Sequence, residues 1–164
     1  MRPRAEKEET ENLPVIPCYH RFVNLTTRFT FDAAHRILGH PGKCAYLHGH
    51  TYHLEVTVAS ARLDALGMVM DFDDLRALVR KAVLDRWDHA TLLAREDPLV
   101  AAVIGVQTEA PEKVVRFKQN PTAEILTREA WEAIRQALPP GVSLLRVRIE
   151  ETPACSSELT LENP

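Results

Sequence analysis

The sequence predicts an α+β fold in which helices cover one face of an antiparallel sheet. Apolar and polar residues alternate over residues 21–35, 50–59 and 142–151, which is the period of half-buried strands. Two further segments, which follow Asp71 and Asn120, repeat their apolar residues at the period of a helix. With a short strand before the first helix, the order is three strands, two helices and a final strand. This order favours an antiparallel sheet with helices on one face.

The first two predicted strands carry histidines at neighbouring ends. His35 ends the first strand and shares its parity with Val23, Leu25, Phe29, Phe31 and Ala33. His48 and His50 open the second strand, and the same face continues with Tyr52, Leu54, Val56 and Val58. The other face carries His53, Glu55 and Thr57 and is predicted to face solvent. Because residues two apart project from one face of a strand, the strand ends can direct three imidazoles at one point.

A third strand and the first helix follow a turn at Asp64 to Gly67. Residues 68–70 (Met-Val-Met) predict the short strand, and Asp71 is the predicted N-cap, with acidic residues in the first turn. The helix is expected to end near residues 87–89. Its apolar stripe is Phe72, Leu75, Val79, Ala82, Val83 and Trp87.

The second half of the chain is expected to hold one more helix and one more strand. Residues 94–119 are predicted to be irregular apart from a short strand over 114–117. Asn120 is the predicted cap of the second helix and Pro121 its first residue. The Pro139-Pro140-Gly141 sequence ends this helix, and the final strand follows. The stripe of the helix is Leu126, Ala130, Ile134, Ala137 and Leu138.

Length and composition predict one domain. The chain has 164 residues, of which 21–164 form the expected domain and the charged, proline-containing residues 1–20 a mobile extension. A net charge of −3 gives no basic surface for nucleic acid, and no apolar run has the length of a membrane span. Three cysteines without framework spacing fit a reducing compartment, so the cytoplasm is expected. Cys18 and Cys155 are predicted to be free thiols.

Four of the seven histidines and one of the three cysteines fall within residues 35–50. His35, His48 and His50 without a fourth protein ligand are typical of a catalytic zinc, which keeps one position open for water or substrate. Single histidines on apolar faces are more often ordinary core or rim residues. His40 lies in a Gly-His-Pro-Gly turn, where it is either a competing ligand or a solvated loop residue. His20 and His53 are interpreted as surface residues.

Six other residues have both a chemical and an ordinary interpretation. Cys44, beside Lys43, is either a thiolate base or nucleophile, a fourth ligand of a structural metal, or a small loop residue. Asp88 and His89 form either a proton relay or a polar helix end. A carboxylate at Glu151 either meets a ligand or is solvated. Thr122 and Glu124 also serve simply to start a helix. Spacing leaves these alternatives open.

Taken together, these segments resemble the 6-pyruvoyl-tetrahydropterin synthase / 6-carboxytetrahydropterin synthase family. The matching segments occur in family order and span residues 29–152. They are Phe31-Asp32-Ala33-Ala34-His35-Arg36, Cys44-x-x-x-His48-Gly49-His50, Val69-Met70-Asp71-Phe72, Asp88-His89, Asn120-Pro121-Thr122-Ala123-Glu124 and Glu151-Thr152. The chain departs from small members in residues 95–119, which are longer than their compact linker.

The resemblance implies a tunnelling fold with a four-stranded antiparallel sheet, and trimers that pair into hexamers with active sites between subunits. It implies zinc on His35, His48 and His50, with Cys44, Asp88 and His89 as the proton-transfer set. It further implies that Glu151 anchors the guanidine-like edge of a pterin, and that Thr122 and Glu124 line the pterin pocket.

The spacing of the cysteine resembles one branch of this family. Three residues separate Cys44 from His48, as in the 6-carboxytetrahydropterin branch of queuosine synthesis, whereas the 6-pyruvoyl branch usually has a longer gap. The implied reaction converts 7,8-dihydroneopterin triphosphate to 6-carboxytetrahydropterin with release of acetaldehyde and triphosphate. The alternatives are 6-pyruvoyl-tetrahydropterin synthase activity and a non-catalytic, zinc-stabilised pterin-binding oligomer.

Overall fold

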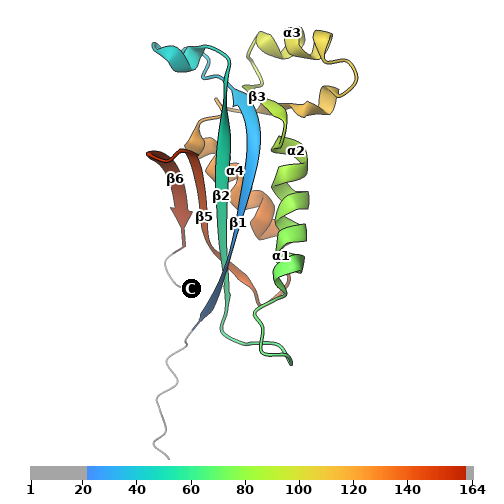
Figure 1. Cartoon of the computed structure of the whole chain (residues 1–164), viewed down its shortest axis with the longest axis vertical. Coiled ribbons are helices and arrows are strands. Elements are labelled where there is room, and N and C mark those ends of the chain that lie inside the picture. Colours follow the sequence, from blue (N-terminus) through green and yellow to red (C-terminus); the bar gives the residue numbers. More distant parts are fainter. Residues whose placement is uncertain (1–21, 162–164) are drawn as a thin grey trace, which may run out of the picture.

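A long antiparallel hairpin forms the centre of the structure, a computed structural model that describes residues 22–161 (Figure 1). Its strands are β1 (Val23–His35) and β2 (His48–Ser60), which pair along their whole length from Val23 with Ser60 to His35 with His48. The predicted parity holds, because Phe31, Tyr52 and Leu54 are fully buried while His53 is exposed. The predicted extension, residues 1–20, lies outside the described residues.

Six strands form the sheet, in the order β4-β3-β1-β2-β5-β6. The outer strands are β3 (Ala90–Ala94), β4 (Val114–Phe117), β5 (Ser143–Thr152) and β6 (Cys155–Thr160). The α+β class is confirmed, but the sheet is mixed, because β3 pairs with β1, and β4 with β3, in parallel. It has six strands, not four, because β3, β4 and β6 belong to it. A helix returns the chain along the sheet before β3, and such a crossover permits parallel pairing (Figure 1).

The first predicted helix is present as one continuous rod. It comprises α1 (Phe72–Val79), a π-helical stretch (Arg80–Leu84) and α2 (Asp85–Trp87). Asp71 is the N-cap as predicted, since its carboxylate accepts the Asp73 amide at 2.7 Å. Leu75, Val79, Val83 and Trp87 are buried, whereas Phe72 is 53% exposed, so the buried stripe begins one turn later than expected.

The second predicted helix, α4 (Ala123–Ala137), has a different cap from the one expected. Thr122 is the N-cap, and its hydroxyl accepts the Ile125 amide. The prediction for Asn120 is wrong because its side chain is bound elsewhere, to the backbone of Leu38. Leu126, Ala130 and Ile134 are buried as expected, while Ala137 at the last position is exposed.

Residues 68–70 do not form the predicted strand. The backbone amides here form local hydrogen bonds instead of sheet bonds. The Asp64 carboxylate accepts hydrogen bonds from the amides of Leu66 and Met68, each at 2.9 Å. The Met68 carbonyl in turn accepts the Asp64 amide at 2.8 Å. A turn organised around one aspartate therefore replaces a strand whose composition was suitable.

Three elements were not expected. The strand over 114–117 was predicted and is present, but β3, β6 and α3 (Leu99–Val106) were not. The eight residues of α3 are apolar or glycine and none is buried, so they carry no helical period that could reveal the helix. β3 has only five residues, a length at which apolar runs do not distinguish strand from helix.

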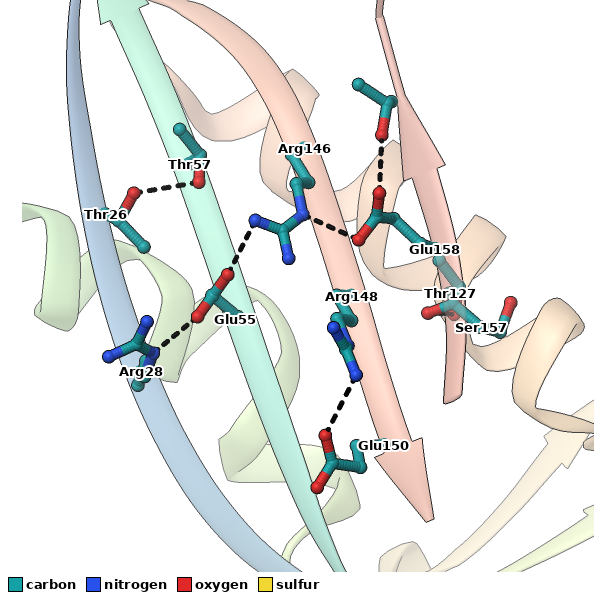
Figure 2. Close-up of polar contacts among 11 residues, drawn as sticks. Thr26, Arg28, Glu55, Thr57, Thr127, Arg146, Arg148, Glu150, Ser157 and Glu158 are labelled. Carbon is teal, nitrogen blue, oxygen red and sulfur yellow. Dashed lines mark hydrogen bonds and ion pairs between the residues drawn. The ribbon is translucent and has the colours of Figure 1, made fainter. Parts of the chain in front are cut away.

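The two faces of the sheet differ in chemistry. The helices cover the face that carries the apolar core, and the open face carries a row of charges across β1, β2, β5 and β6 (Figure 2). Arg28 binds Glu55, Arg146 binds Glu55 at 2.8 Å, and Arg146 binds Glu158 at 2.7 Å. Thr57 departs from the solvent-side prediction, since it is 7% exposed and bonds Thr26 at 2.9 Å. Between residues 22 and 161, no helix is long and apolar enough to cross a membrane.

Candidate metal centre and adjoining cavity

The ends of β1 and β2 bring His35, His48 and His50 together. Strand pairing places His35 opposite His48, and His50 opposite Ala33. Their ring centroids lie 4.6 to 5.2 Å apart, and one ligand atom from each lies within 4.8 Å of the others. Gly49, between the two β2 histidines, lets the backbones of β2 and β1 lie close together at this point. A Cβ at Gly49 would lie 3.2 Å from the Ala33 carbonyl oxygen, a tight contact.

Backbone carbonyls fix the orientation of two of these rings. His35 Nδ1 donates to the Pro121 carbonyl at 2.9 Å, and His48 Nδ1 donates to the Tyr46 carbonyl at 2.7 Å. A carbonyl only accepts, so the proton sits on Nδ1 and the Nε2 lone pair is available. Nε2 of His35 is buried and makes no hydrogen bond within the described residues. A buried acceptor without a partner, in a set of three imidazoles, fits a metal ion.

Burial keeps His35 neutral. Its side chain is 3% exposed, and burial lowers its pKa from 6.5 to about 4 despite the opposing hydrogen bond to Pro121; His48 and His50 add to the lowering. Metal ligation needs the neutral imidazole. His35 is therefore ready to bind a metal throughout the neutral range.

The metal-free protein is expected to lose stability as the pH falls from about 6.5 to about 4. In this window the unfolded chain binds a proton at His35 that the folded chain does not, so protonation favours unfolding. At about 1.4 kcal/mol for each pH unit, the loss approaches about 3 kcal/mol. Urea unfolding with a chelator should show this slope, and His35→Gln should flatten it. Parallel slopes for the two proteins would contradict the assignment.

A cavity of about 580 Å³ adjoins the three histidines. It is also lined by Cys44, Thr122, Glu124 and Glu151, so seven of the nine predicted site residues share one cavity. The compact cluster of ligand atoms does not include the Cys44 sulfur. Cys44 therefore shares the cavity with the three histidines without being a member of their set.

The acidic residues of the cavity come from two directions. Glu124 stands in the first turn of α4, where the Thr122 hydroxyl and then its own backbone amide lower the pKa of its carboxyl. Glu151 lies near the end of β5, with Oε1 3.9 Å from His35 Nε2. The ring of Tyr52 lies 5.4 Å from that of His50; its buried phenol has no hydrogen-bond partner among residues 22–161, and burial raises its pKa. Tyr52 is therefore neutral, and the carboxylates supply the negative charge of the cavity.

The remaining predicted pair, Asp88 and His89, does not line this cavity. Asp88 Oδ1 bonds His89 Nδ1 at 2.9 Å and accepts the Asp32 amide at 3.1 Å. Asp32 is three residues from His35 on the same strand, so its side chain lies on the opposite face. His89 is 76% exposed and has a φ of 58°, a left-handed conformation that is uncommon for a residue other than glycine. Within one chain, the pair and the histidine cluster are separate.

Backbone contacts hold the Asp88-His89 pair in place. The His89 amide donates to the Asp32 carbonyl at 2.7 Å, and Lys113 Nζ donates to the carbonyls of Asp85 and Asp88 at 2.9 and 2.8 Å. Partial burial opposes ionisation of the Asp88 carboxyl, but hydrogen bonds from the Asp32 amide and the His89 ring, and the nearby charge of Lys113, lower its pKa. The pair is thus a rigid carboxylate-imidazole unit that faces outward.

Several residues near the site were not predicted to belong to it. Thr152, Cys155, Ser156 and Ser157 line the cavity because β6 folds back on β5. Cys155 is a free thiol as predicted, and it lies at the cavity. His40, for which the sequence left a competing ligand and a loop residue as alternatives, also lines the cavity but is outside the compact histidine set, and its Nδ1 accepts the Gly42 amide at 3.0 Å. No local pattern marks Cys155, Ser156 and Ser157 as site residues, because β6 was not visible in the sequence.

Comparison with known proteins agrees with this geometry. Residues 24–162 match the family model described as 6-pyruvoyl tetrahydropterin synthase. A protein of Rickettsia bellii named 6-carboxy-5,6,7,8-tetrahydropterin synthase is 37% identical over 139 residues, which is 84% of this chain and 99% of that protein. A protein of the same name from Haemophilus influenzae is 31% identical, over 82% of this chain and 96% of its own length.

Solved structures share the fold. An uncharacterized protein from Wolinella succinogenes has a TM-score of 0.75 at 22% identity and covers 87% of this chain and 99% of its own. The 6-pyruvoyl tetrahydropterin synthase of Caenorhabditis elegans has a TM-score of 0.64 at 24% identity, over 87% of this chain and 97% of its own. Both likenesses concern the arrangement of sheet and helices described above.

Proposed function

Because this chain belongs to the 6-pyruvoyl tetrahydropterin synthase family, we propose that it is a zinc-dependent 6-carboxy-5,6,7,8-tetrahydropterin synthase. Its substrate would be 7,8-dihydroneopterin triphosphate, and acetaldehyde and triphosphate would be released. In this proposal the enzyme acts in the cytoplasm, in queuosine synthesis. The curated relatives with the 6-carboxy name, and the three residues between Cys44 and His48, favour this branch.

The observation that carries the proposal is the set of three histidines beside a cysteine in one cavity. His35, His48 and His50 would hold the zinc and leave a position for substrate oxygens. The bound zinc supplies Lewis acidity that stabilises negative charge on those oxygens. Three imidazole nitrogens are one of the ligand sets that zinc takes in catalytic sites.

The other residues of the cavity would bind the pterin and move protons. Cys44 would remove a carbon-bound proton of the substrate side chain, since it lines the same cavity as the histidine set without belonging to that set. Glu151 would accept two N–H hydrogen bonds from the guanidine-like edge of the pterin, a bidentate geometry that fixes a flat ring. Thr122 and Glu124 would line the pterin pocket from the start of α4.

Asp88 and His89 would act on a substrate bound to another subunit. This follows from their separation from the histidine cluster within one chain and from the exposed His89 ring. His89, oriented by Asp88, would exchange a proton on the opposite side of the substrate from Cys44. A homohexamer, built as a dimer of trimers with active sites between subunits, would bring the two halves together.

Product identification tests this proposal. The zinc-loaded protein is incubated with 7,8-dihydroneopterin triphosphate, with and without a chelator, and the products are identified by mass. We expect a 6-carboxy product together with acetaldehyde, and no turnover after zinc removal. A product that keeps all its side-chain carbons would instead support 6-pyruvoyl activity, the name carried by the matching family model. Absence of both products would contradict the enzymatic proposal.

A further inference from the structure

The side chain of Asn120 joins two segments that are 82 residues apart. Its Oδ1 accepts the Leu38 amide, and its Nδ2 donates to the Leu38 carbonyl, each at 2.9 Å. One amide thus satisfies both polar groups of a backbone residue. Asn120 is not needed as a helix cap, because Thr122 has that place. The contact is therefore a clasp between the loop after β1 and the entry to α4.

On one side the clasp reaches His35. Asn120 is followed by Pro121, which is buried and whose carbonyl accepts the His35 Nδ1 proton at 2.9 Å. The proline ring fixes φ, so a shift of Asn120 would carry the Pro121 carbonyl with it. That carbonyl keeps the proton on Nδ1 and aims Nε2 at the other two histidines. The position of Asn120 therefore bears on the orientation of one metal ligand.

On the other side the clasp reaches Cys44. Leu38 is preceded by Ile37, whose amide donates to the Cys44 carbonyl at 2.8 Å. Fixing the backbone of Leu38 holds Ile37 in place, and with it the short 3₁₀ turn Lys43–Ala45 that carries the thiol. The Asn120 side chain thus binds the residue next to Ile37, which holds the Cys44 loop. In the chain, Asn120 is also next to Pro121, which orients His35.

We propose that Asn120 is a positioning residue, which sets the His35 imidazole and the Cys44 loop relative to each other. The inference deepens the proposed function, since it takes His35 as a metal ligand and Cys44 as the reactive thiol. Asn120 itself touches neither the metal nor the substrate in this proposal. Its effect passes through Pro121 and Leu38.

We expect the variant Asn120→Ala to fold, with the segments that Asn120 joins held less firmly. Arg36 binds Asp97 separately, with Nε 2.6 Å from Oδ2, and the Asp97 side chain has no exposed surface. This second contact anchors the strand end when Asn120 is removed. The change in Asn120→Ala is therefore expected to be local to residues 37–44 and 120–121.

Two measurements on Asn120→Ala test the proposal. Cobalt(II) titration, followed by its visible absorption, should show about tenfold weaker binding, as for loss of other outer-shell contacts to a metal ligand. Hydrogen exchange in the metal-free protein should show the Ile37 amide exchanging about tenfold faster, with the amide of Leu54 in the core unchanged. The matched control is Asn24→Ala, at the exposed far end of β1, which should behave as wild type in both.

A second variant covers the case in which Asn120→Ala does not fold. Asn120→Asp keeps the acceptor for the Leu38 amide but places a carboxylate oxygen against the Leu38 carbonyl, so the same two changes are expected. Wild-type cobalt affinity and wild-type Ile37 exchange in the folded variant would overturn the inference. Failure of the wild-type protein to bind cobalt would count against the proposed metal site, and Ile37 exchange would still decide the role of Asn120.

Discussion

Cys44→Ala is expected to lower turnover about a thousandfold while the zinc content stays unchanged. The proposed role of the thiolate is to remove a proton in the transition state, and loss of such a group typically costs 10² to 10⁴ in rate. Cys44 lines the cavity, but its sulfur is outside the set of three histidines, so the metal should remain. The measurement is steady-state turnover of 7,8-dihydroneopterin triphosphate together with metal analysis of the same sample.

The chain offers a matched control for this variant. Cys155 is a second free thiol that lines the same cavity and is exposed, and Cys155→Ala should keep most of the activity. Loss of zinc with Cys44 would identify that residue as a fourth ligand and contradict its role as a base. Unchanged turnover and unchanged metal would favour a non-catalytic, zinc-stabilised pterin-binding oligomer.

His48→Ala is expected to abolish both metal binding and turnover. Two imidazoles do not retain zinc as three do, and His48 is oriented for ligation by the Tyr46 carbonyl. His48 is only half buried, so the substitution should cost little packing. Metal stoichiometry after dialysis against a weak chelator measures the first effect, and product formation measures the second.

His53 provides the control on the same strand. It lies on the opposite face of β2, where its Nδ1 is 3.3 Å from the Thr30 hydroxyl, and His53→Ala should leave metal and turnover unchanged. Full zinc occupancy in His48→Ala would contradict the three-histidine site. Loss of metal in both variants would point to a general effect on β2 instead of loss of one ligand.

Apart from the four-residue strand β4, the parts of the fold that the sequence predicted are those with a long, regular period. β1 and β2 have thirteen residues each with clear alternation, and α4 has fifteen with a buried stripe. The parts that it did not predict are short or uniform. β3 has five residues, and α3 carries apolar residues on every side. Residues 68–70 had the composition of a strand, but the Asp64 carboxylate holds that backbone in a turn.

The candidate site also contains residues that the sequence predicted and residues that it did not. Strand parity was sufficient to predict that His35, His48 and His50 project toward one point, and the family motifs selected Cys44, Thr122, Glu124 and Glu151, which line the adjoining cavity. Neither source indicated that β6 would add Ser156 and Ser157 to the cavity wall. Adjacency in sequence also gave no information on where Asp88 and His89 would lie relative to the cluster.

Sequence alone thus determined the α+β class, the central hairpin and the face from which the three histidines project. These features follow from local periodicity, because the spacing of residues in a strand or helix sets the face to which each side chain points. Only the tertiary structure decided that Asn120 clasps Leu38 instead of capping α4, and that Asp88 and His89 lie apart from the cavity. The reason is physical: a side chain that can satisfy either a helix end or a distant backbone takes the partner that the fold brings near it.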